Sequence, residues 1–229
     1  THRINNHFLW HDIQHGLLHI DKGILFTARE LFTRPGHTIR EFLEGKRVKH
    51  FKPLSLVIVL AGFYGFLSHY FDINMLSNNV TVSGTGEEYN KTKELVNNIS
   101  EWLAMHYSIF AIIQIPVFSV GTYLCFKKAG FNFMEHLVIN TFLTGQRLIL
   151  HIITFPLYYI FNETANLKTT ARVVDLIGYI IFVWAIIQLF NKFSTIQRIW
   201  RTALSLFIAL IINFIILTIV FKIAVNTIK

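Results

Sequence analysis

Five long apolar runs divide the chain and predict an all-α protein that crosses a membrane several times. The runs cover residues 53–71, 102–126, 136–161, 173–190 and 202–220. About 20 mostly apolar residues in a helix span the hydrocarbon core of a bilayer. Each run reaches or approaches that length. We therefore expect five transmembrane helices, with residues 53–229 forming the membrane domain.

The segments between the runs predict which side of the membrane each part faces. Residues 72–101 are polar and turn-rich, which predicts a long external loop. Fourteen Lys and Arg lie before the first run or in the loops on that side, against six on the other side. Cytoplasmic loops usually carry this excess. We therefore expect a cytoplasmic N-terminus and an external C-terminus, and no nucleic-acid partner despite the formal charge of +8.

Histidines recur every four residues near the N-terminus, at His7, His11, His15 and His19. At ~100° per residue this spacing keeps the imidazoles on one arc of an amphipathic helix. An i, i+4 pair of histidines can share one metal ion, so His11, Asp12, His15 and His19 predict a divalent-metal site. The alternatives are a polar helix face at the lipid headgroups and a pH-sensing face.

The rest of residues 1–52 predicts further amphipathic helices in the cytoplasmic interface. A stretch over residues 24–32 is broken at Arg34-Pro35-Gly36, and a short helix over residues 37–43 leads to a basic linker before Pro53. Basic groups beside a span attract anionic lipid headgroups by about 1 kcal/mol each. The predicted lipid-binding cations are Arg34, Arg40, Lys46, Arg47, Lys49 and Lys52. The alternative is that they only fix the topology.

The first 60 residues resemble a known family. His11-Asp12-Ile13-x-His15-Gly16, Asp21-Lys22-Gly23, Arg34-Pro35-Gly36, Gly45-Lys46-Arg47 and Pro53 are similar to the signature of domain-of-unknown-function family 3667, a family of bacterial membrane proteins. The resemblance implies the inner membrane of a bacterium, with the C-terminus in the periplasm. Members often carry a Cys-rich zinc ribbon before this segment, and residues 1–20 contain no cysteine. The family implies no established activity.

Ionisable side chains within the runs are costly in lipid, so they mark paired or functional positions. At 1.5 Å per residue, His69, His106 and His151 are expected in one outer-leaflet layer, with Asp175 close above and Arg147 nearer the midplane. One interpretation is a path for protons or ions, and another is structural pairing of Arg147 with Asp175. A haem held by two of the histidines is the weakest interpretation.

No motif of a known catalytic class is present in the chain, and Cys125 is its single cysteine. We therefore expect a non-enzymatic module that binds lipid or a protein partner, or an accessory subunit of a membrane complex. The first alternative is a transporter or ion- or proton-conducting protein that uses Arg147, His151, His69 and Asp175. The second is a metal-dependent membrane enzyme built on the N-terminal His/Asp helix.

Overall fold

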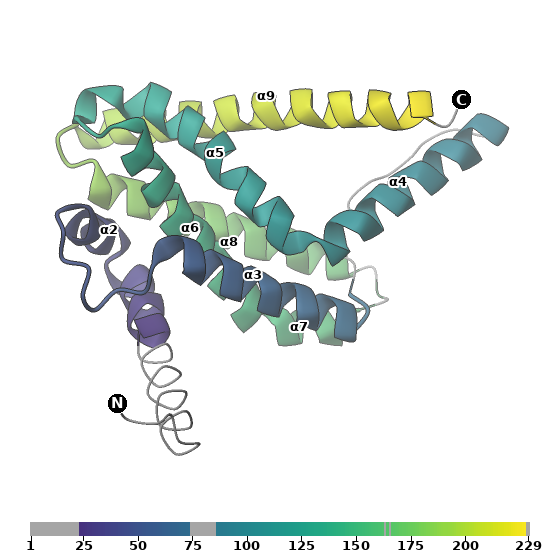
Figure 1. Cartoon of the computed structure of the whole chain (residues 1–229), viewed down its shortest axis with the longest axis horizontal. Helices are drawn as coiled ribbons and strands as arrows, with labels where there is room; N and C mark the ends of the chain where they lie inside the picture. The colour runs from purple at the N-terminus through teal and green to yellow at the C-terminus, as the bar shows by residue number, and fades with distance from the viewer. Residues whose placement is uncertain (1–22, 74–85, 163, 165, 228–229) are drawn as a thin grey trace, which may run out of the picture.

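The computed structural model describes residues 23–73, 86–162, 164 and 166–227, and these contain helices, turns and loops without a strand (Figure 1). The predicted all-α class is confirmed for this part of the chain. A helical segment over residues 23–33 precedes the named elements. These are α2 (Pro35–Leu43), α3 (Pro53–Tyr70), α4 (Glu87–Met105), α5 (Tyr107–Phe126), the 3₁₀ turn η2 (Lys127–Ala129), α6 (Phe133–Ile153), α7 (Phe155–Ile160), α8 (Asn166–Leu189) and α9 (Thr195–Thr227).

Within the described residues, four helical stretches are long and apolar enough to cross a membrane. They are Pro53–Tyr70, Ile109–Ala129, Asn166–Leu189 and Thr195–Val220. The helices therefore support a membrane protein. Four of the five predicted spans correspond to these stretches, although the second begins later than residue 102, because α4 ends at Met105 and a new helix begins at Tyr107.

The predicted span over residues 136–161 is the one that the structure does not support. Its helix stops at Ile153, and a short helix, α7, follows from Phe155 to Ile160. The polar side chains of α6 also lower its hydropathy, and most of them are buried against other helices. This helix therefore lies in the centre of the bundle, where it packs on α3, α5 and α8.

Residues 23–52 cover the end of the bundle at which α3 begins and α8 ends, which we call the basic end. The helical segment 23–33 runs across the direction of α3 (Figure 1). The predicted break falls where expected, since Pro35 occupies the first turn of α2. A Cβ atom on Gly36 would lie 2.5 Å from the backbone nitrogen of Leu189, so α2 and α8 meet with no space for a side chain.

Helix α9 is held mainly by α5. The two helices cross where a Cβ atom on Gly121 would lie 2.4 Å from the carbonyl oxygen of Ser205. Small residues allow helix backbones in membranes to approach this closely. Further along, the Gln114 amide donates a hydrogen bond of 2.9 Å to Asn213 Oδ1. Beyond that bond the two helices diverge (Figure 1).

Candidate functional site

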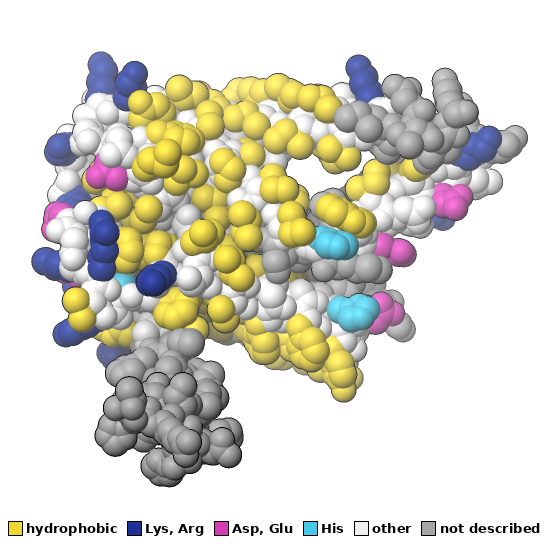
Figure 2. Space-filling model, viewed as in Figure 1, with side chains coloured by type: hydrophobic (Ala, Val, Ile, Leu, Met, Phe, Trp, Pro, Cys, Tyr) yellow, Lys and Arg dark blue, Asp and Glu magenta, His cyan; other side chains and the backbone are white. Residues whose placement is uncertain are grey.

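Lys and Arg side chains gather at the basic end (Figure 2). Several of them donate hydrogen bonds to carbonyl groups at the ends of helices. Helix C-termini leave carbonyl groups without partners inside the helix, and cations stabilise them. Arg40 donates to the carbonyls of Leu189 and, at 3.3 Å, Gln188. Arg198 donates to the Ile187 carbonyl at 2.6 Å. Similar bonds join Arg201 to Cys125 and Lys192 to Ala129.

Arg34 is occupied in a different way. Its Nε donates to Glu30 Oε2 at 2.5 Å, and its Nη1 lies 3.5 Å from Glu41 Oε1. The hydrogen bond to the Glu30 carboxylate, followed by the charge of that group, raises the pKa of the guanidinium further above its usual range. Arg34 and Arg40 therefore hold α2 in place, and the lipid binding that the sequence predicts for both stays a prediction.

The other four predicted lipid-binding cations lie in the loop between α2 and α3, residues 44–52, which we call the basic loop. Lys46, Arg47, Lys49 and Lys52 are all exposed. Lys46 is 3.9 Å from Glu41, and Arg47 donates to the Phe42 carbonyl while lying over the Phe42 ring. The side chains of Lys49 and Lys52 make no polar contact with the described residues. Val48, between Arg47 and Lys49, is fully exposed, at 101%.

A second group of polar side chains lies inside the bundle, on α6, α7 and α8. Arg147 Nη2 donates to Asp175 Oδ1 at 2.8 Å, and the His151 Nε2 atom lies 3.6 Å from the same oxygen. The other ring nitrogen of His151 is 3.0 Å from the Tyr158 hydroxyl. The structural pairing expected between Arg147 and Asp175 is present, and His151 and Tyr158 extend it.

The other two histidines of the predicted layer are His69 and His106. His69 is exposed near the end of α3. His106 stacks on Trp102 of its own segment, with ring centroids 4.5 Å apart. The solute path expected from the sequence requires Arg147, His151, His69 and Asp175 around one cavity.

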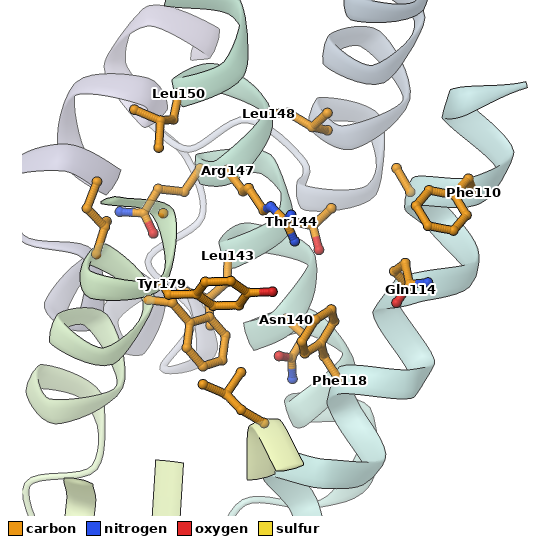
Figure 3. Close-up of a pocket in the computed structure, with 16 residues that line it drawn as sticks. Phe110, Gln114, Phe118, Asn140, Leu143, Thr144, Arg147, Leu148, Leu150 and Tyr179 are labelled. Carbon is orange, nitrogen blue, oxygen red and sulfur yellow. The ribbon is translucent and has the colours of Figure 1, made fainter. Parts of the chain in front are cut away.

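The bundle does contain a cavity of about 90 Å³, bounded by α5, α6 and α8 (Figure 3). Of the four residues named for the solute path, only Arg147 lines this cavity. Other polar lining residues are Gln114, Asn140, Thr144, Gln146 and Tyr179. The guanidinium of Arg147 is 5.7 Å from the centre of the Tyr179 ring.

Sequence reasoning missed a polar network on the α5–α6 contact. His136 Nδ1 lies 3.1 Å from the Thr122 hydroxyl, which also accepts a bond of 2.8 Å from the Asn140 amide. The His136 ring is stacked on Phe190 with centroids 5.8 Å apart. The signal in the sequence was the i, i+4 spacing of His136 and Asn140, which places both side chains on one helix face.

The proposed metal site at His11, Asp12, His15 and His19 lies outside the described residues. Over the part of the chain that is described, no group of three His, Cys, Asp or Glu side chains is arranged to hold a metal ion.

Comparison with known proteins gives one match. The model of a family described as "Protein of unknown function (DUF3667)" matches residues 21–65. The predicted family resemblance is confirmed. The DUF3667 segment includes the helical segment 23–33, α2, the basic loop and most of α3. No curated protein and no solved structure matches the chain.

Proposed function

We propose that this chain is a non-enzymatic membrane module that binds anionic lipid headgroups through the basic loop. The observation that supports this function is the separation of the cations at the basic end into two sets. Arg40, Arg198, Arg201 and Lys192 are used by helix ends, whereas Lys46, Arg47, Lys49 and Lys52 extend from a loop around an exposed valine.

The loop composition suits the boundary between water and lipid. Lys and Arg side chains attract phosphate groups at a membrane surface. An exposed apolar side chain between them gains free energy when it enters the acyl boundary, as for other interfacial segments. A loop that only fixed topology would need the charges and not the exposed Val48.

Removal of these four charges tests the proposal. Native mass spectrometry of the purified chain would count bound phosphatidylglycerol and phosphatidylcholine for the wild type and for K46Q/R47Q/K49Q/K52Q. At about 1 kcal/mol per cation, the variant should bind phosphatidylglycerol at least tenfold more weakly, with phosphatidylcholine unchanged. Added salt should weaken wild-type binding because it screens exposed charges.

A matched control removes the same charge from the opposite end. The variant K91Q/K93Q/K168Q/R172Q should keep wild-type binding of phosphatidylglycerol. Equal losses in the two variants, or equal binding of the two lipids by the wild type, would overturn the proposal.

We also propose that the basic end faces the cytoplasm of a bacterial cell, with the chain in the inner membrane. The support is the excess of Lys and Arg at this end. The only native cysteine, Cys125, is buried, so V48C would introduce one accessible thiol. An impermeant maleimide should label V48C in spheroplasts only after permeabilisation. Labelling of V48C in intact spheroplasts would contradict the proposed orientation and place the basic end outside the cytoplasm.

A further inference from the structure

The cavity between α5 and α8 is lined by hydrogen-bonding groups that have no partner among the described residues. Asn140 is 1% exposed and donates from its amide nitrogen to Thr122 and to the His136 carbonyl, at 2.8 and 2.9 Å. Its oxygen has no partner, although it is fully buried. Buried polar atoms are nearly always hydrogen-bonded, so this acceptor indicates that a donor belongs in the cavity.

Two hydroxyl groups line the same cavity. Neither the Thr144 nor the Tyr179 hydroxyl forms a hydrogen bond with any residue that the structure describes, and each can both donate and accept. Figure 3 shows Thr144 and Asn140 on α6 and Tyr179 on α8, on different sides of the space. A group that donates to Asn140 and exchanges hydrogen bonds with the two hydroxyls would satisfy all three.

Two of the side chains that line the cavity are partly exposed. Arg147 is 41% exposed in its side chain and Tyr179 is 40% exposed, so the rim can be reached from outside. Tyr179 lies near the middle of α8, roughly 20 Å from its start at 1.5 Å per residue. The next residue of α8, Ile180, is also exposed. A ligand that enters at this depth of a membrane helix comes from the hydrocarbon phase.

The charge at the rim is balanced. Arg147 is already bonded to Asp175, so the pair is neutral as a whole. Charged groups are costly at this depth of the bilayer. The cavity therefore favours a polar head without charge.

We propose that this cavity binds the uncharged, hydroxyl-bearing head of a single-chain amphiphile that enters from the bilayer between α5 and α8. Its head donates to the Asn140 oxygen and bonds to the hydroxyls of Thr144 and Tyr179, while its chain remains among the exposed apolar side chains. This site is independent of the basic loop, shares no residue with it and requires a neutral ligand.

The test uses the full chain in lipid nanodiscs with a photoreactive analogue of 1-oleoyl-glycerol. Wild-type labelling should saturate and map to residues around the cavity. In T144V/Y179F the two hydroxyls are lost with almost no change in shape. Because the variant loses two hydrogen bonds and each contributes about 1 kcal/mol, it should bind the probe roughly thirtyfold more weakly. Its melting temperature should not fall, since neither hydroxyl bonds to a residue that the structure describes.

The matched control is T218V/Y159F, which makes the same two changes at exposed positions outside the cavity. It should bind the probe as the wild type does. Unlabelled 1-oleoyl-glycerol should displace the probe, and oleate, with the same chain and a charged head, should not. Labelling that does not saturate, equal weakening in the control variant, or displacement by oleate would overturn the proposal.

Discussion

Helices α6 and α9 belong to the same bundle, but their surroundings are opposite. More than half of the α6 residues are buried, among them His136, Asn140 and Gln146. In α9, only 11% of the most apolar window is buried, and its outer side chains are Phe, Leu, Ile and Val. In a membrane, the helix with the greater hydropathy is the one that faces lipid. The polar helix is the one that the others surround.

The largest effect is expected where α9 is anchored. Gly121→Ala places a methyl group against the backbone carbonyl of Ser205. This carbonyl can move away only if α9 shifts relative to α5. Overpacking of this kind costs about 2–3 kcal/mol. Gly145→Ala in α6 is the matched control, because its methyl group would lie 3.0 Å from the mobile end of Leu56. Thermal unfolding in detergent should show a large loss for the first variant and little for the second.

The charge on α6 provides the next test. Arg147→Leu leaves the Asp175 carboxylate without its cation in an apolar setting, and we expect a loss of about 2 kcal/mol after allowing for the partial exposure of the pair. Arg147→Leu/Asp175→Leu removes both charges and should recover most of the stability. A double variant that is less stable than the single one would contradict this account of the pair.

Matched asparagines compare the two helices directly. Asn140→Leu in α6 removes two hydrogen bonds from a buried site, which should cost about 1.5 kcal/mol. Asn213→Leu in α9 removes one bond at a half-buried site, and bonds between membrane helices average about 0.6 kcal/mol. Chemical unfolding of the two variants measures the difference. Equal losses of stability in the two variants would show that burial does not determine the cost of losing an asparagine in these helices.

The smallest effect concerns pH at the basic end of α6. His50 packs on Phe42, which in turn meets Phe142 of α6 edge to face. Burial lowers the pKa of His50 below its usual 6.5, and the charges of Glu30 and Glu41 oppose the shift. His50 therefore binds a proton more readily in the unfolded chain than in the folded one. The contribution of His50 to stability is present above about pH 6.5 and is lost as the pH falls through the folded pKa.

His50→Phe removes this titration. The stability difference between wild type and variant, followed by thermal unfolding from pH 8 to 5, should change in favour of the variant as the solution becomes acidic. A constant difference over this range would exclude His50 as the group responsible.

Hydropathy along the chain was sufficient to predict the all-α class and four membrane helices. Local turn chemistry also placed the break at Pro35 and the start of α3 at Pro53. The predicted span over residues 136–161 is not confirmed, because the helix found there is less apolar than the other four and most of its polar side chains are buried. The α6 run contains Asn140, Gln146 and Arg147, and side chains of this polarity favour the surrounded position.

The interior site was predicted only in part. Helical rise placed Arg147, His151 and Asp175 at similar depths, and they do meet. Depth says nothing of the direction around a helix axis, so the layer predicted for His69 and His106 stays a prediction. Counting cations in the sequence also could not separate those that bind helix ends from those of the basic loop. The carbonyls that the first set binds can be far away in the chain, about 150 positions for Arg40.

The contact between Gly36 and α8 also constrains the order of events during synthesis. Residues 35–43 leave the ribosome about 150 residues before Ala185 and Leu189, the backbone groups against which Gly36 packs. Through that interval the apolar face of α2, which includes Ile39 and Phe42, has no partner on α8. Docking of α2 can therefore complete only after α8 has been made and inserted. Protection of residues 35–43 from protease is thus a late marker that reports on the whole assembled bundle.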